Sequence, residues 1–169
     1  MKFVKLIKAE KFENSTDNDV YNFLINYKHE DADVAEGIVQ YGDYMLVDAH
    51  DEKELAYNFI HNVLGSFNEV AKKDQEKYFD FAKYAQLFID SSEFTLNNNN
   101  EYVDSEGINS GTSDKEELGK FIFKNFFDSN FENINKEDLE KCFNYEKFGK
   151  MLLQEADFYK LNDEYYIQC

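Results

Sequence analysis

The sequence predicts an α+β fold made of tandem small modules, each with short helices and an antiparallel β-hairpin or small sheet, in an elongated acidic arrangement. Residues 51–103 (the first repeat) and 114–167 (the second repeat) align with one single-residue shift. Both copies place helical apolar stripes before short segments typical of hairpin strands. A tandem repeat of about this length indicates a copied supersecondary unit. We therefore predict three domains, at residues 1–50, 51–107 and 108–169.

The first domain is predicted to be a small α+β module that carries weak echoes of the repeat. Its local pattern predicts a strand at residues 2–7 and a helix at 19–27. Strands are expected at 36–41 and 44–48, joined by a turn at Gly42-Asp43.

Each repeat is predicted to begin with a helix. Capping-box spacing marks its start at Asp51 and Glu54 in the first repeat, and at Ser113 and Glu116, or Asp114 and Glu117, in the second. The apolar stripe of the first copy ends at Gly65, a residue type favoured at helix C-termini.

Two more helices and a hairpin are predicted to follow in each repeat. The second helix is short and covers residues 72–77 or 136–141, and the third starts near Ala82 or Glu146. The Gly- and Ser-rich segment 104–112 is expected to link the copies. The hairpin strands are predicted at 94–96, 102–103, 158–161 and 165–167.

An aromatic signature recurs around the third helix of each repeat. It reads Phe79-Asp80-Phe81 and Lys83-Tyr84-Ala85 in the first copy, and Phe143-Asn144-Tyr145 and Lys147-Phe148-Gly149 in the second. We predict that its aromatic side chains, with the first residue of each hairpin, are core: Phe79, Phe81, Tyr84, Phe94, Phe143, Tyr145, Phe148 and Phe158.

The charge is strongly negative and spread along the chain. There are 35 acidic residues against 18 lysines, no arginine, and a net charge of −17. The three predicted domains carry excesses of −5, −7 and −5. We therefore expect no direct binding of nucleic acid, because binding to its phosphates requires clustered Lys and Arg. Solubility alone would also explain an acidic surface.

No catalytic residue, cofactor or metal site is predicted. The three histidines are not at metal-ligand spacing, and Asp31-Ala32-Asp33 with Gly37 departs from a calcium loop. Neither a phosphate-binding loop nor a nucleophile elbow occurs. With no long apolar stretch, no membrane association is expected, and the predicted location is the cytoplasm of a bacterial host. Cys142 and Cys169 are expected to be unpaired thiols.

The second repeat resembles a known family. The run from Phe143 through Leu152, followed by Ala156-Asp157-Phe158, resembles the C-terminal signature of the ArdA antirestriction proteins. Residues 75–103 fit the same signature again. Departures include Lys150 where the family usually has Arg, and the presence of two copies where it usually has one.

The resemblance implies a function without catalysis. It implies a DNA mimic from a phage or mobile element, which occupies the DNA groove of a type I restriction-modification enzyme, and it implies a homodimer. The physical basis is that carboxylates at i and i+4 of a helix lie about 5–6 Å apart, close to the spacing of successive phosphates along one strand. The candidate phosphate-mimicking acids flank the predicted helices and hairpins: Asp51, Glu52, Asp74, Glu76, Asp90, Glu93, Asp114, Glu116, Glu137, Glu140, Glu155 and Asp157.

Two alternatives stay open. An anti-CRISPR protein that blocks the nucleic-acid groove of a CRISPR effector demands a similar acidic surface. An acidic adaptor that binds a protein partner through apolar contacts, with no mimicry, is of a different class. Salt discriminates between the classes, because mimicry weakens steeply with ionic strength and apolar docking does not.

Overall fold

The computed structural model describes residues 9–169, which form a mixed helix and sheet fold. These residues divide into two compact units. Unit 1 combines residues 9–65 with Tyr145–Cys169, and unit 2 is Ser66–Asn144. The strand predicted at residues 2–7 lies outside the described residues.

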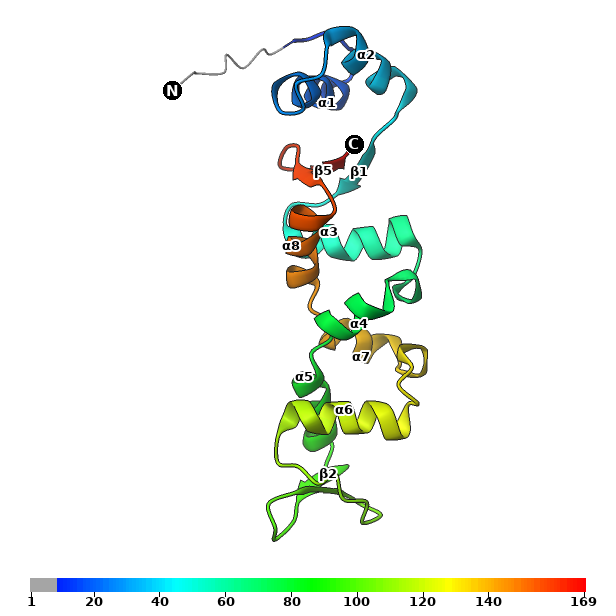
Figure 1. The fold of residues 1–169 in the computed structure, drawn as a ribbon, viewed down its shortest axis with the longest axis vertical. Helices are drawn as coiled ribbons and strands as arrows, with labels where there is room; N and C mark the ends of the chain where they lie inside the picture. Colours follow the sequence, from blue (N-terminus) through cyan, green and yellow to red (C-terminus); the bar gives the residue numbers. More distant parts are fainter. Residues whose placement is uncertain (1–8) are drawn as a thin grey trace, which may run out of the picture. The chain divides into compact units, whose positions relative to one another are not determined.

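Unit 1 is built around a three-stranded antiparallel sheet of order β1-β5-β4. Helices α1 and α2 lie on one side of the sheet, and α3 and α8 lie on the other (Figure 1). Ile167 at the centre of β5 pairs with Leu46 of β1 and Tyr159 of β4. The elements are α1 (Ser15–Asn26), α2 (Ala32–Tyr41), β1 (Met45–Asp48), α3 (Glu52–Asn58) continued by the π-helix η1 (Phe59–Leu64), α8 (Tyr145–Glu155), β4 (Phe158–Lys160) and β5 (Tyr165–Gln168).

The predicted strand at 36–41 and its hairpin with 44–48 are wrong. Residues 36–41 belong to helix α2, because Ala35 and Val39 lie one turn apart and bury the same face of the helix. Gly42 then ends the helix in a left-handed conformation, with φ of 69° and its N–H bonded to the Val39 carbonyl. The strand β1 pairs with β5, which is more than a hundred residues away in sequence.

Unit 2 combines short helices from both repeats with a two-stranded antiparallel sheet. The sheet pairs Phe94 with Asp104 and Leu96 with Tyr102. The elements are η2 (Phe67–Glu69), α4 (Lys72–Tyr78), α5 (Phe81–Asp90), β2 (Phe94–Leu96), β3 (Tyr102–Asp104), α6 (Lys115–Phe126), η3 (Phe131–Asn133) and α7 (Lys136–Cys142).

Most of the local predictions for the repeats are confirmed. The helix ending at Gly65, both short second helices and both third helices are present, and each hairpin forms within one residue of its predicted strands. Asp51 caps α3 by accepting a hydrogen bond from Glu54 N–H at 2.8 Å. Asp114 does the same for α6 with Glu117, which decides between the two predicted caps of the second repeat.

The segment 104–112 does more than link the repeats. Asn109 forms a β-bridge with Val103, and the Ser110 N–H donates to the Tyr102 carbonyl at 2.9 Å. The segment therefore folds back along the outer edge of β3.

The repeats exchange their helices. In unit 1, the first helix of the first repeat, α3, packs against the third helix of the second repeat, α8. In unit 2, the first helix of the second repeat, α6, packs against α5 of the first. The compact units therefore cut across the predicted boundaries of 51–107 and 108–169, because each helix pair takes one member from each repeat.

Within unit 2, matching residues of the two repeats face each other. Phe79 and Phe143 occupy the same repeat position and form a β-bridge. Its two hydrogen bonds are reciprocal: Asp80 N–H donates to the Cys142 carbonyl at 2.8 Å, and Asn144 N–H donates to the Tyr78 carbonyl at 2.7 Å. Each segment therefore makes the same contact with the other, as expected for two segments related by a local two-fold axis.

The aromatic signature is core, as predicted. All eight of its side chains are buried, and Phe79 lies edge-on to Phe81 and to Tyr84 with ring centroids 5.0 and 5.4 Å apart. Both cysteines are free thiols. Burial raises the pKa of the Cys142 thiol to about 11, so it stays protonated and packs as a small apolar side chain.

Candidate partner-binding surface

The twelve candidate acids lie on the surfaces of both units. None is buried, and only Glu52, Asp74 and Glu140 are half-buried. Four belong to unit 1 and eight to unit 2. A carboxylate that already forms a hydrogen bond or an ion pair within the protein is less available to a partner. The contacts of each candidate therefore decide how well it could mimic a phosphate.

Three of the candidates serve the fold through hydrogen bonds. Asp51 and Asp114 are the N-caps of α3 and α6. Asp90 accepts a hydrogen bond from the Gln86 side chain at 2.7 Å.

Three further candidates are paired with lysine one helical turn away. Glu116 binds Lys120 at 2.8 Å and Glu137 binds Lys141 at 2.7 Å, while Glu140 lies 3.9 Å from Lys136. The hydrogen bond from Lys141 lowers the pKa of Glu137. A lysine beside each carboxylate offsets its charge toward an approaching partner, so these three are weaker mimics of phosphate.

The remaining six candidates form no ion pair with a described lysine, although the charge of Glu52 contributes to the raised pKa of Lys150. Their side chains make no hydrogen bond or ion pair with any of residues 9–169, and four of them are fully on the surface. We call these six the open acids: Glu52, Asp74, Glu76, Glu93, Glu155 and Asp157.

Reasoning from the acids alone missed a second signal, which is the distribution of lysine. Residues 29–52 contain eight acids and no lysine, and residues 84–114 contain six acids and no lysine. The first stretch covers α2, β1 and the start of α3 in unit 1, and the second covers the β2–β3 hairpin in unit 2. The acids added by this signal are Glu30, Asp31, Asp33, Glu36, Asp43, Asp48, Glu101, Asp104 and Glu106.

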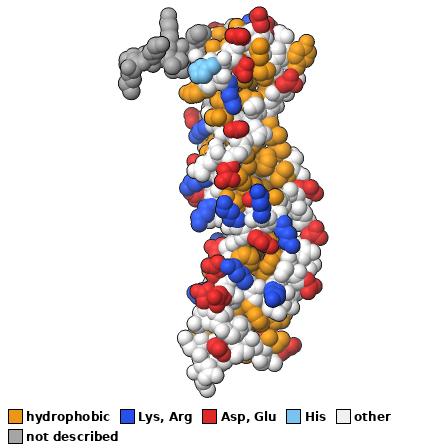
Figure 2. Space-filling model, in the orientation of Figure 1, with side chains coloured by type: hydrophobic (Ala, Val, Ile, Leu, Met, Phe, Trp, Pro, Cys, Tyr) orange, Lys and Arg blue, Asp and Glu red, His pale blue; other side chains and the backbone are white. Residues whose placement is uncertain are grey.

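The surface agrees with this distribution. On the face shown in Figure 2, acidic and basic side chains are interspersed over the helices, whereas no basic side chain appears over the β2–β3 hairpin. The β2–β3 hairpin therefore presents no basic side chain on this face, whereas lysines from other elements reach the first stretch: Lys160 Nζ lies 3.2 Å from the His50 carbonyl oxygen.

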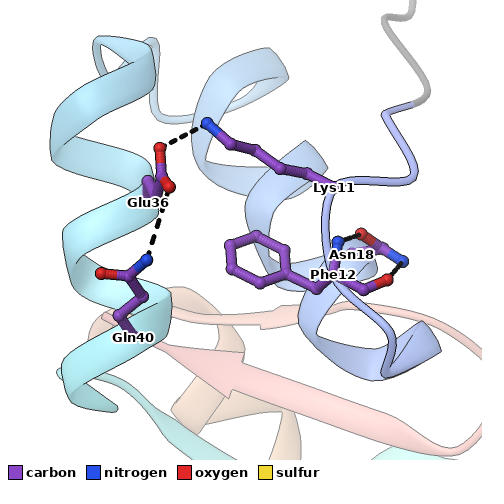
Figure 3. Close-up of polar contacts among 5 residues, drawn as sticks. All are labelled: Lys11, Phe12, Asn18, Glu36 and Gln40. Carbon is purple, nitrogen blue, oxygen red and sulfur yellow. Dashed lines mark hydrogen bonds and ion pairs between the residues drawn. The ribbon is translucent and has the colours of Figure 1, made fainter.

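Glu36 is the exception within the first stretch. Its carboxylate forms an ion pair with Lys11 and accepts a hydrogen bond from Gln40 (Figure 3). The segment around Lys11 is fixed to α1 by Asn18, whose side chain accepts from Phe12 N–H and donates to the Phe12 carbonyl, both at 2.8 Å. Glu36 thus anchors the N-terminal segment and is unsuited to contact a partner.

A polar cleft of unit 1 surrounds His50. The His50 Nδ1 lies 2.7 Å from the Asp163 carbonyl oxygen, and its backbone N–H donates to Glu54. The pKa of His50 is raised, first by the hydrogen bond to Asp163 and then by the charges of Glu54, Glu164 and Asp51. The backbone of His50 therefore contacts α3 and its ring contacts the β4–β5 turn, and protonation of the ring ensures that Nδ1 carries the hydrogen donated to the Asp163 carbonyl.

We expect the stability of unit 1 to depend on this histidine. Because the folded pKa is raised, its contribution is fully present below the unfolded value of about 6.5 and is lost as the pH rises through the folded pKa. Urea unfolding at pH 6 and pH 8 should show a larger loss for the wild type than for His50→Gln, which retains a donor but does not titrate. Equal losses in the two proteins would contradict the assignment.

The described part of the chain contains neither a candidate metal site nor a candidate membrane-spanning helix. No group of three or more His, Cys, Asp or Glu side chains within residues 9–169 has an arrangement that could hold a metal ion. No helix in this range has both the length and the apolar character needed to cross a membrane.

Comparison of the chain with protein-family models, with curated proteins and with solved structures finds no match in any of the three. A function can therefore be inferred only from the residues and surfaces of this chain.

Proposed function

We propose that this protein is a non-enzymatic DNA mimic that inhibits a bacterial defence enzyme by occupying the DNA-binding groove of a type I restriction-modification complex. The observation that carries the proposal is the presence of surface carboxylates without lysine partners in both units. Among the described residues, unit 1 has 18 acidic residues and 6 lysines, and unit 2 has 17 acidic residues and 9 lysines, so each unit carries an excess of negative charge.

The physical reason is charge complementarity. A groove that binds duplex DNA presents Lys and Arg to phosphates spaced about 1.7 Å apart along the axis when both strands are counted. The open acids and the acids of the lysine-free stretches other than Glu36 offer such a groove carboxylates that form no ion pair with a described lysine. The resemblance of the aromatic signature to the ArdA family supports the choice of target. The signature itself is buried, so recognition is assigned to the acids around it.

A competition titration tests the proposal. The protein is added to a type I methyltransferase that holds labelled duplex DNA, and separately to a CRISPR effector that holds its guide. We expect displacement of the DNA from the methyltransferase at stoichiometric protein. Blockage of the CRISPR effector alone would replace the proposal by the anti-CRISPR alternative, and activity against neither would leave the acidic adaptor.

Ionic strength separates mimicry from apolar docking. Raising the salt from about 50 to 500 mM should weaken displacement by at least about 100-fold. The reason is that salt screens contacts between exposed charges, and the Debye length falls well below 10 Å over this range. The measurement is the concentration of protein that displaces half of the labelled DNA, corrected for the salt dependence of DNA binding itself. Displacement that does not respond to salt would contradict mimicry.

A further inference from the structure

A polar groove of unit 1 runs along helix α1. Its volume is about 410 Å³, and it is bounded by Ala9 and Glu10 on one side and by Lys160 and Leu161, at the end of β4, on the other. Helix α1 lines it along its full length, from Ser15 to Tyr27, with residues three or four positions apart. Such residues lie on one face of a helix, so they form one continuous wall.

Asparagine recurs every fourth residue on this helix, and two of the asparagines bind the backbone of the chain's own N-terminal segment. Asn18 accepts a hydrogen bond from Phe12 N–H and donates one to the Phe12 carbonyl, both at 2.8 Å (Figure 3). Asn22 accepts from Ala9 N–H at 3.0 Å and donates to the Ala9 carbonyl at 3.3 Å. Each side-chain amide therefore binds both backbone groups of one residue, a contact that does not depend on the side chain of that residue. The row consists of Asn14, Asn18, Asn22 and Asn26.

The spacing of the row matches an extended chain. A helix rises about 1.5 Å per residue, so amides four residues apart are separated by about 6 Å along α1. Alternate residues of an extended chain direct their backbone groups to the same side and are about 6.6 Å apart. A peptide that lies extended along α1 can therefore present every second residue to successive asparagines.

The row continues into the groove beyond the residues that the N-terminal segment contacts. Asn22 and Asn26 both line the groove, one helical turn apart. A carboxamide has two donor hydrogens and two acceptor positions, and Asn22 uses one of each on Ala9. The contact with Ala9 therefore leaves Asn22 able to bind a second backbone segment.

The C-terminal end of the groove is apolar. Tyr27 is 68% exposed and stacks on buried Phe23, with ring centroids 5.7 Å apart and 24° between the ring planes. Leu161 lines the groove with them. An exposed aromatic ring beside groups that bind backbone is the combination by which peptide-binding sites hold a side chain of the ligand.

The charged residues of the groove are largely engaged elsewhere. Its described charged lining residues are Glu10, Asp19 and Lys160. Asp19 accepts a hydrogen bond from the Asn162 side chain at 3.0 Å, and the Lys160 ammonium donates to the His50 carbonyl at 3.2 Å. Recognition in the groove is therefore assigned to the amides and the apolar side chains.

We propose that the α1 groove binds an extended, uncharged segment of a partner protein that has apolar side chains at alternate positions. Asn22 and Asn26 bind the backbone of alternate residues, and Phe23, Tyr27 and Leu161 contact an apolar side chain. The class of ligand follows from the contacts of Asn18 and Asn22 with the chain's own non-helical segment, which show what these amides bind. The site goes beyond the proposed mimicry, because its contacts do not depend on acidic residues.

The test uses a defined, uncharged probe. An acetylated and amidated six-residue peptide of alternating serine and valine is titrated into the full-length ¹⁵N-labelled protein. We expect saturable binding, with the largest shifts at the side-chain amide signals of Asn22 and Asn26 and at the backbone signal of Tyr27. A peptide of the same sequence that is N-methylated at every residue lacks the backbone donors of those residues, and we expect it to bind at least about 10-fold more weakly.

Two matched variants complete the test. Asn26→Leu keeps the approximate shape of the side chain but removes its donors and acceptors, and we expect a loss of at least about 10-fold. Asn125→Leu is the control in unit 2. Both asparagines lie at the C-terminal end of a helix and donate to the carbonyl four residues earlier, at 2.8 Å for Asn26 and 2.9 Å for Asn125. We expect Asn125→Leu to bind the peptide as the wild type does.

Several results would overturn the proposal. They are equal binding of the methylated peptide, equal losses in the two variants, shifts centred outside the groove, and no binding. Nuclear Overhauser effects between the Asn26 side chain and residues 1–8 in the free protein would make the chain's own N-terminal residues the occupant. Shifts of the same signals with protein concentration alone would make a second copy the occupant.

The DNA competition titration reports separately on mimicry. Asn26→Leu should displace DNA from the methyltransferase as the wild type does. If the peptide fails to bind while DNA is still displaced, the peptide site is wrong and mimicry stands. Peptide binding at the groove without displacement of DNA would refute mimicry and leave the peptide site.

Discussion

Replacing Gly149 or Gly119 by alanine is expected to destabilise the protein by roughly 3 kcal/mol in each case, which is the largest effect on stability that the structure predicts. A Cβ on Gly149 would lie 1.9 Å from the Glu52 carbonyl oxygen, and one on Gly119 would lie 2.0 Å from the Phe81 carbonyl oxygen. Both obstacles are backbone atoms of the partner helix, so the helices themselves would have to separate.

The two glycines are the contact points of the exchanged helix pairs. Gly149 brings α8 onto α3, and Gly119 brings α6 onto α5. In each pair the glycine comes from the second repeat. The helices from the first repeat carry buried Ala56 and Ala85 at the matching positions. The close approach therefore depends on one residue in each pair.

Gly37 provides the matched control. It lies within α2, and no atom lies within 4 Å of the position that an alanine Cβ would take, so Gly37→Ala should stabilise the protein by about 0.5–1 kcal/mol through helix propensity alone. Urea unfolding followed by circular dichroism gives the comparison, with a global fit that allows each unit its own transition. A midpoint for Gly149→Ala at or above that of the wild type would contradict the predicted clash.

The sequence was sufficient for the local structure of the repeats because caps and apolar periodicity are encoded within a few residues. It failed at α2, where Ile38 and Val39 favour a strand by residue type, but Ala35 and Val39 share a helical face. It could not predict the exchange of helices. Two similar repeats offer each first helix two nearly equivalent partners, and local patterns do not choose between them.

Whether the candidate acids contact a partner stays a prediction, and the sequence indicates only some of the contacts that these acids make within the protein. Exposure of an acidic residue follows from its type, so the surface position of all twelve candidates carries little information. Two of their ion pairs with lysine could be predicted from the sequence, because Glu116 and Lys120, and Glu137 and Lys141, are four residues apart on predicted helices. The pairing of Glu36 with Lys11 was not visible, because it spans two elements and depends on tertiary structure.

Changing four open acids to amides is expected to weaken inhibition by about 100-fold, since four lost charge contacts at ~0.7 kcal/mol each amount to about two factors of ten. The variant combines Glu76→Gln, Glu93→Gln, Glu155→Gln and Asp157→Asn. These four side chains are exposed and make no ion pair with a described residue, so the fold should be retained. Half-displacement of labelled DNA from the methyltransferase is the measurement.

A second variant changes the net charge by the same amount at acids that are paired with lysine. It combines Glu116→Gln, Glu137→Gln, Glu140→Gln and Glu146→Gln, whose lysine partners lie one helical turn away. Removing these carboxylates leaves each lysine uncompensated, so long-range attraction to a basic groove falls in both variants alike. Direct contacts fall only in the open-acid variant, whose loss should therefore exceed that of the paired variant by about 10-fold or more. Equal losses would show that total charge alone carries the inhibition, and no loss in either variant would reduce the acidity to a contribution to solubility.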